Sequence, residues 1–367
     1  MKKLLLALLL ALAPTAFAST WYVDGVHGSD SNDCKTRQTA CKTIGHAISL
    51  ASSRDTIGVG PATYKENLTI NISLKIIGAD ARTTIVDGNH SGTVFTVSAP
   101  ANISRLTIQN GRGDGIRSSD TLILSRCIVT GNTGSGSGID NEGTLTVSMC
   151  TITGNSFTGG YNGGITNNEG RLTVKRSTIT GNSGGGYSGG ILNLEGTATV
   201  NNSTITGNSF IGGSSGGIAN LEGTTTINNS TITRNSFTGG NSGGIANLEG
   251  VATTLQNTIT ANNSPWNCYS TVTSGGYNLS DDDSCNFNGP GDMNNTEPLL
   301  GTLGNNGGPT QTIPELAGSP TIDAGNPTGC RNSNGALLGM DQRHYPRPGK
   351  YKNDKRCDIG AYESQTD

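Results

Sequence analysis

The chain has 367 residues, of which only 14% are charged, and its formal net charge at pH 7 is −3. This balance excludes the strongly basic surface with which proteins bind nucleic acid or an anionic membrane. Glycine, at 55 residues, is abundant enough to suggest low-complexity disorder. A regular repeat through the middle of the chain predicts an ordered fold instead.

Residues 1–18 have the three parts of a secretory signal peptide. Lys2 and Lys3 form a basic start, Leu4–Leu12 is an apolar run, and Ala16-Phe17-Ala18 is a small-x-small cleavage site. The apolar run is shorter than the about 20 residues that span a bilayer, and no later stretch approaches that length. We therefore predict bacterial export to the cell surface or the medium, a mature chain that begins near Ser19, and no transmembrane segment.

The eight cysteines predict disulfides, because an exported chain meets an oxidising compartment and no CxxC motif indicates a metal or redox site. Their spacing favours local pairs. The expected pairs are Cys34 with Cys41, Cys127 with Cys150, Cys268 with Cys285, and Cys330 with Cys357. For Cys127 and Cys150, two reduced thiols in the core are the alternative.

Residues 19–67 are expected to form an N-terminal cap and the first coil of a repeat protein. Trp21–Asp24 has the composition of a strand, and Thr43–Ser53 carries apolar residues at helical spacing. A short helix there would cover the core of the first coil, whose strand edges would otherwise be exposed.

A repeated unit of 23 to 27 residues occupies residues 68–265, and its isoleucines recur at 139, 165, 191, 218 and 245. Short runs within each unit alternate apolar and polar residues between Gly and Asn turns, which is the pattern of β-strands. One unit cannot bury its apolar side alone, so neighbouring units must stack. The sequence therefore predicts an all-β fold, a right-handed parallel β-helix.

Stacking of the units also predicts columns of identical residues, because each coil repeats the turn of the previous one. An amide ladder is expected at one turn, since Asn tolerates left-handed backbone and stacked amides bond to one another. Its expected members are Asn132, Asn155, Asn182, Asn208, Asn235 and Asn262.

Two acidic groups are candidate Ca²⁺ sites, because carboxylates are the ligands that Ca²⁺ uses in proteins. The first is a column of glutamates, each followed by Gly: Glu142, Glu169, Glu195, Glu222 and Glu249. The second is the run Asp281, Asp282 and Asp283. A solvated turn or loop is the favoured explanation for both, and Ca²⁺ is the alternative.

Asp114, Arg117 and Asp140 are the best candidate catalytic residues in the coils. Alignment by one coil places Arg117 beside Asp140. A polysaccharide lyase needs a basic residue near carboxylates, and an inverting glycoside hydrolase needs two carboxyl groups. A surface ion pair is the simpler explanation of this grouping.

Thr-Ile-Thr segments predict a flat outward face of threonines around inward isoleucines. Its members are Thr151, Thr153, Thr178, Thr180, Thr204, Thr206, Thr231, Thr233, Thr258 and Thr260. This face is a candidate for binding a surface, ice included, although Thr is simply a good strand former on an exposed strand. Three nearby phenylalanines, Phe157, Phe210 and Phe237, are expected to pack under a loop, with sugar stacking as the alternative.

Three parts of the chain resemble known families. The segments from Tyr22 to Glu66 resemble the N-terminal cap of bacterial β-helix proteins of the pectate-lyase-like superfamily. The Gly-Gly-Ile and Ser-Thr-Ile-Thr-Gly-Asn repeats are similar to those of polymorphic outer membrane proteins. Residues 266–367, expected to be an irregular disulfide-stapled cap, resemble the choice-of-anchor Q domain through Asn306–Thr310, Gly318–Gly325, Asp341–Arg343 and Cys357–Glu363. These resemblances imply a β-helix and export, and they carry no catalytic residues.

The sequence therefore favours a monomeric, secreted or cell-surface β-helix that binds polysaccharide or another cell-surface component without catalysis. A polysaccharide lyase or glycoside hydrolase of the pectate-lyase-like superfamily is the first alternative, and an ice-binding protein is the second. The four histidines all lie outside the regular coils, so no complete catalytic constellation is recognisable in them.

Overall fold

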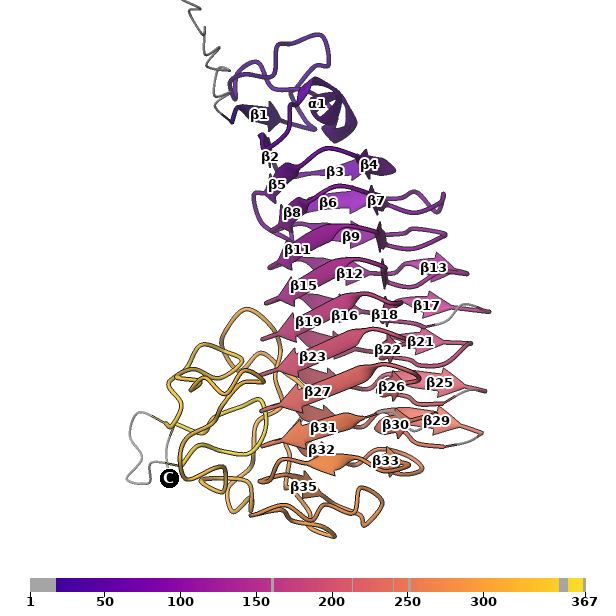
Figure 1. Ribbon diagram of the computed structural model, residues 1–367. Coiled ribbons are helices and arrows are strands. Elements are labelled where there is room, and N and C mark those ends of the chain that lie inside the picture. Colours follow the sequence, from indigo (N-terminus) through magenta and orange to yellow (C-terminus); the bar gives the residue numbers. More distant parts are fainter. Residues whose placement is uncertain are drawn as a thin grey trace, which may run out of the picture.

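The computed structural model describes residues 18–159, 162–212, 214–239, 241–249, 252–349 and 356–365. Residues 1–17, which hold nearly all of the expected signal peptide, lie outside this part of the chain. The described residues wind into a right-handed parallel β-solenoid of about eight turns (Figure 1). Among them, no helix has the length and apolar character to cross a membrane.

Three long parallel sheets form the walls of the solenoid, and successive coils add successive strands to them (Figure 1). Sheet A contains β1 (Thr20–Val23), β2 (Thr56–Val59), β5 (Leu74–Gly78), β8 (Ala101–Ser104), β11 (Thr121–Ser125), β15 (Thr144–Ser148), β19 (Arg171–Lys175), β23 (Thr197–Asn201), β27 (Thr224–Asn228), β31 (Thr253–Gln256) and β34 (Thr273–Ser274). Sheet B contains β3 (Ala62–Lys65), β6 (Thr84–Asp87), β9 (Thr107–Gln109), β12 (Ile128–Thr130), β16 (Thr151–Thr153), β20 (Thr178–Thr180), β24 (Thr204–Thr206), β28 (Thr231–Thr233), β32 (Ile259–Ala261) and β35 (Leu279–Ser280).

Sheet C and a small outer sheet complete each coil. Sheet C contains β4 (Leu68–Ile70), β7 (Phe95–Val97), β10 (Ile116–Ser118), β14 (Ile139–Asn141), β18 (Ile165–Asn167), β22 (Ile191–Asn193), β26 (Ile218–Asn220), β30 (Ile245–Asn247) and β33 (Cys268–Tyr269). Sheet D, formed by the loops between sheets B and C, contains β13 (Thr133–Gly134), β17 (Ser156–Phe157), β21 (Ser183–Gly184), β25 (Ser209–Ile211) and β29 (Ser236–Thr238). The three walls thus continue past residue 265, where the repeat was expected to end.

The core is a set of apolar columns that run along the solenoid axis. The isoleucines that begin the central strands of sheet C lie in register from coil to coil, and all are fully buried. Each coil covers the apolar edge of the previous one, which explains why the repeat folds only as a stack. The short helix α1 (Ile44–Leu50) begins after the N-cap Thr43 and packs Ile44 and Ala47 on the first coil, as predicted.

The predicted amide ladder is present, with one correction. Asn132 donates from Nδ2 to Oδ1 of Asn155 at 2.8 Å, and the same bond repeats down to Asn235. Asn235 then donates to Asn263 at 3.0 Å, and Asn262, the predicted member, is exposed. A second amide ladder, not predicted above, runs along sheet C. Its members are Asn141, Asn167, Asn193, Asn220 and Asn247.

The correction at Asn263 has a local cause. The paired residues Ala219 and Ala246 of β26 and β30 are 27 positions apart in the sequence, whereas Thr225 and Thr253 of β27 and β31 are 28 apart. The turn between β30 and β31 is therefore one residue longer than the turn between β26 and β27. A slip of one residue moves a side chain to the opposite face of a strand. Ile259 accordingly pairs with Thr231 and points outward, while Thr260 takes the inward place beside Ile232.

Three of the four expected disulfides are present, namely Cys34–Cys41, Cys268–Cys285 and Cys330–Cys357. The expected bond between Cys127 and Cys150 is wrong, because both are buried free thiols. In-register stacking holds equivalent side chains about one strand spacing, ~4.8 Å, apart. That is longer than the Cβ separation of about 3.5–4.5 Å that a disulfide uses.

The C-terminal region does more than close the end of the solenoid. Residues 296–349 and 356–365 run back beside sheet B (Figure 1). Gln342 donates from Nε2 to Thr178 Oγ1 at 3.0 Å and accepts from Thr204 Oγ1 at 2.8 Å. The backbone N–H of Ala361 donates to Thr231 Oγ1 at 3.1 Å. The region is therefore docked on the solenoid flank by the threonines of sheet B.

Candidate functional site

Asp114, Arg117 and Asp140 come together on the outer face of sheet C. Arg117 in β10 is the direct strand partner of Asp140 in β14, as the one-coil alignment predicts. Its Nε lies 3.1 Å from Asp140 Oδ2 and 3.8 Å from Asp114 Oδ2. Asp114 stands just before β10, and its Oδ1 accepts a hydrogen bond of 2.7 Å from the backbone N–H of Ser137. One guanidinium is thus held between two carboxylates.

Burial shifts the protonation of both carboxyl groups. The pKa of Asp114 is raised to about 6, mainly because burial removes the carboxyl from water. The charge of Asp140 also raises it, while the Ser137 N–H and Arg117 act in the opposite direction. Burial also raises the pKa of Asp140, and Arg117 partly offsets that increase. Asp114 therefore changes its charge in mildly acidic solution, unlike an ordinary exposed aspartate.

The cluster lies in a recess with a cavity volume of about 140 Å³. Its wall includes Glu142 and Thr166, and the loop that carries Ser135, Gly136 and Ser137 encloses it from the side of sheet D. The recess therefore offers carboxylate acceptors, a guanidinium donor and hydroxyl groups in one small space, a combination that binds sugar hydroxyls.

The raised pKa of Asp114 predicts a specific pH dependence. The folded state holds the Asp114 proton more tightly than the unfolded chain does, so this group's contribution to stability falls as the pH rises from about 4 to about 6. Asp114→Asn removes that contribution but keeps the acceptor for Ser137. We expect the free energy of unfolding of the variant, relative to the parent, to rise by about 2–3 kcal/mol between pH 4 and pH 7. Parallel stability curves in urea unfolding over this range would show that Asp114 titrates normally.

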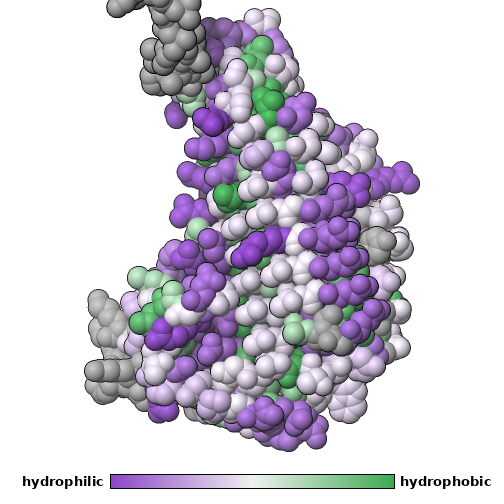
Figure 2. Space-filling model, viewed as in Figure 1, coloured by the Kyte–Doolittle hydropathy of each residue, from purple (hydrophilic) through white to green (hydrophobic). Residues whose placement is uncertain are grey.

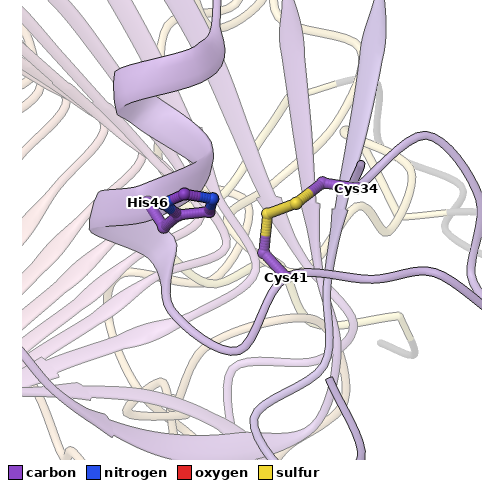
Figure 3. A group of neighbouring side chains, drawn as sticks. All are labelled: Cys34, Cys41 and His46. Atoms are coloured by element: carbon purple, nitrogen blue, oxygen red, sulfur yellow. A yellow bond between two sulfur atoms is a disulfide. The ribbon is translucent and has the colours of Figure 1, made fainter. Parts of the chain in front are cut away.

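The glutamate column does not form a metal site in the structure. The side chains of Glu142, Glu169, Glu195, Glu222 and Glu249 are all exposed at the turns between sheets C and A. Across the described part of the chain, only Cys34, Cys41 and His46 bring three ligand-type atoms within 4.8 Å of one another. Their two sulfur atoms are bonded to each other (Figure 3), so they are not free to bind a metal. The side chains are solvated at the turns, as the favoured explanation has it, and Ca²⁺ binding by the glutamates stays a prediction.

The aspartate run has a structural task at the last coil. Asp281 accepts hydrogen bonds from the backbone N–H of Asn262 and from Nδ2 of Asn267. Asn267 accepts from Asn263 and is the last amide of the ladder, so Asp281 terminates it. Asp282 accepts from Ser284 and from the backbone N–H of Asn267. Although burial acts to raise the pKa of Asp282, these bonds outweigh it and hold the pKa below its usual range. The two carboxylates are therefore occupied by the chain itself, and Asp283 is exposed.

The threonine face is not the exposed surface that the repeat predicted. Seven of its ten members are buried: Thr178, Thr204, Thr206, Thr231, Thr233, Thr258 and Thr260. The C-terminal region covers them, and the register slip turns Thr260 into the core. Only Thr151, Thr153 and Thr180 keep partial exposure. A binding or ice-binding role for this face is therefore wrong for most of its length.

The phenylalanines pack under their loops, as predicted. Phe157, Phe210 and Phe237 are buried in sheet D, and the rings of Phe210 and Phe237 stack with centroids 5.7 Å apart. They support the loops that stand beside the outer face of sheet C and are not available for stacking on a sugar.

One charged feature was not predicted from the sequence, a row of arginines at the corner between sheets A and B. Arg105, Arg126 and Arg176 occupy the same left-handed turn position on different coils, with φ between 50° and 61°. Each lies one residue after a sheet A strand. The recurrence of a long basic residue at that position was a signal that could have been found in the repeat.

Comparison with known proteins agrees with the β-helix fold described above. The sequence model described as "right handed beta helix region" matches residues 24–167 and 95–263, together more than half of the chain. The chain belongs to this family. The β-helix is also similar to the crystal structure of pectate lyase Pel9A, with a TM-score of 0.53, 15% identity, and coverage of 95% of this chain and 97% of that one.

A second solved structure is less similar to this chain. It is the GH136 lacto-N-biosidase from Eubacterium ramulus, with a TM-score of 0.32, 12% identity, and coverage of 71% of this chain and 63% of that one. A comparison with curated protein sequences finds no match. The pectate lyase structure therefore supports the fold, and the activity has to be argued from the site.

Proposed function

We propose that this β-helix is an exported protein that binds carbohydrate on the outer face of sheet C, with Arg117, Asp114 and Asp140 at the centre of the site. The observation that carries the proposal is the guanidinium held between two carboxylates in a small recess. Charged donors and acceptors fixed side by side form strong, directional hydrogen bonds with adjacent sugar hydroxyls. The signal-like start of the sequence and the three disulfides support export.

Binding without cleavage is the simplest reading of the cluster, because Arg117 already engages both carboxylates. Two hydroxyl groups line the recess beside the charged cluster, and Thr166 Oγ1 lies 2.5 Å from Ser137 Oγ. These groups favour a hydroxyl-rich ligand laid across the coils. Because the similar solved structure is a pectate lyase, polysaccharides are the first ligands to test.

The test is retention of the purified chain on a panel of immobilised neutral and acidic polysaccharides. Arg117→Gln removes the charged donor, and Arg112→Gln, at an exposed position outside the recess, is the matched control. We expect Arg117→Gln to weaken binding at least about tenfold, because a hydrogen bond to a charged group contributes about 1.5–3 kcal/mol. Retention of no polysaccharide, or equal retention by Arg117→Gln and the parent, would contradict the proposal.

One observation favours a second function, glycoside hydrolysis. A carboxyl group with a pKa of about 6 is suited to act as a general acid, and Asp114 has that property beside a second carboxylate. The same panel decides this point if shortened products are also measured. Cleavage that is lost in Asp114→Asn would establish the hydrolase, and retention without products would support binding alone.

A further inference from the structure

A groove runs along the corner between sheets A and B, away from the sheet C site. Its cavity volume is about 650 Å³. One wall is the solenoid corner with Arg82, Arg105 and Arg126, and the other is the segment Asn305–Gln311 of the C-terminal region. In the space-filling view, the C-terminal region stands out from the solenoid flank and leaves a hollow above it (Figure 2).

The basic wall has a regular spacing that the fold imposes. The backbone N–H of Arg105 donates to Ser125 O, that of Arg126 to Ser148 O, and the next turns continue in the same way. Successive turns therefore stack at the strand spacing, about 4.8 Å. Met149 takes the place of Arg on the next coil, and Arg176 follows it beyond the end of the groove.

The charge in the groove is opposite to that of the whole chain. Among the described residues, three arginines and one acidic residue, Asp80, line it, whereas the chain has a formal net charge of −3. Asp80 is already paired with Arg82, whose Nε lies 2.9 Å away. Arg105 and Arg126 are exposed and have no acidic partner among the described ion pairs.

The second wall is fixed, so the groove is a permanent feature of the fold. Thr178 donates from Oγ1 to the carbonyl oxygen of Gln311 at 2.6 Å, and Thr310 donates to that of Arg176 at 3.4 Å. At the lower end of the arginine row, Arg176 Nη1 lies 3.4 Å from Nδ1 of His344. Burial lowers the pKa of His344, and the positive charges of Arg176 and Arg126 lower it further. Both arginines therefore contribute to the positive potential at this end of the row.

We propose that this groove binds an extended anionic polysaccharide, with Arg105 and Arg126 contacting acidic groups on the sugar chain. The rise per coil is close to the length of one sugar residue in an extended chain, so repeated anions meet repeated cations. Thr151 and Asn305 provide hydroxyl and amide partners for sugar hydroxyls. Among the described residues, no aromatic side chain lines the groove, so they give nucleic acid bases nothing to stack on.

The experiment measures the affinity of the purified full chain for alginate oligosaccharides at low and high salt. The double variant Arg105→Asn/Arg126→Asn removes both charges and keeps residues that accept the left-handed backbone, since Asn202 and Asn229 occupy the same turn position on later coils. Arg54→Asn makes the same change at an exposed left-handed position away from the groove and is the matched control.

We expect the double variant to bind alginate about 5- to 20-fold more weakly, with a shallower dependence on salt, because each exposed charge pair contributes only modestly. Arg54→Asn should bind alginate as the parent does, and neutral dextran should not compete. Undetectable alginate binding by the parent, an unchanged affinity in the double variant, or equal binding of a single-stranded oligonucleotide of the same charge would overturn the proposal. Because the double variant leaves Asp114, Arg117 and Asp140 intact, its outcome separates this groove from the proposed carbohydrate site.

Discussion

Ile205→Asp is expected to prevent stable folding of the solenoid. Ile205 is fully buried in β24 and lies in register between Ile179 and Ile232 on the neighbouring coils. An aspartate there would face the apolar column with no partner for its charge, and such a change costs at least about 4 kcal/mol. Because each coil is folded against the next, the loss should spread along the stack.

The measurement for Ile205→Asp is thermal unfolding followed by circular dichroism, with Thr197→Asp as the control. Thr197 is exposed in β23 of the same coil, so the control introduces the same charge on the outside. The control should keep the parent's midpoint within a few degrees, because surface changes usually lie within about 0.5 kcal/mol. A cooperative transition of Ile205→Asp near the parent's midpoint would show that the phase of the repeat is wrong.

Arg347→Met is expected to release the C-terminal region from the solenoid flank. The Arg347 side chain is fully buried, and its Nε lies 3.1 Å from Glu363 Oε2. Its Nη2 donates to the carbonyl oxygens of Gly360 and Tyr362 at 2.8 and 3.0 Å. Removal of the guanidinium would leave a buried carboxylate and two carbonyl groups without this partner, and breaking a buried ion pair costs about 3–5 kcal/mol.

Limited proteolysis and hydrogen exchange measure this release. We expect faster cleavage within residues 296–365 and faster exchange of sheet B amides in β24 and β28, while sheet C keeps its protection. The double variant Arg347→Met/Glu363→Gln should recover part of the protection, since it no longer leaves an unpaired buried charge. Unchanged proteolysis of Arg347→Met would mean that this ion pair does not hold the region in place.

The segments that resemble a choice-of-anchor Q domain do structural work in this chain. Gln342 bonds to the threonines of sheet B, as described above, and Arg343 donates from Nε to Asp341 Oδ2 at 2.8 Å. The Arg343 guanidinium also lies over the rings of Tyr345 and Tyr362, at 4.4 and 3.4 Å. These contacts explain Gln342 as a docking residue, and they explain Asp341 and Arg343 as residues that hold the C-terminal region together.

Local periodicity was enough to predict the solenoid. Alternation within short runs determined which side chains point inward, and the column of Ile139, Ile165 and Ile191 follows directly from it. The same one-coil alignment placed Arg117 beside Asp140, since strand partners in a parallel stack are fixed by the repeat length. The acid–base cluster was therefore predictable in its pairing, although the burial that raises the pKa of Asp114 was not.

Two of the failures depend on features that a repeat does not encode. The one-residue insertion before β31 turns Ile259 outward and places Asn263 in the amide ladder. The insertion lies in a turn, where the sequence pattern does not show which residues of successive coils are paired. The threonine face was misread because its cover comes from residues more than 100 positions later. Cys127 and Cys150 were paired by proximity alone, without regard to their parallel side-chain directions.

The most direct test of the proposed function is hydroxyl-radical footprinting of the full chain with and without a polysaccharide that it retains. We predict protection of Arg117, of the partly exposed Leu194 at the edge of the recess, and of other side chains around the sheet C cluster, with little change at Thr197 on sheet A. Protection confined to other surfaces, with Arg117 and Leu194 as reactive as in the free protein, would contradict the assignment of the binding site to the outer face of sheet C.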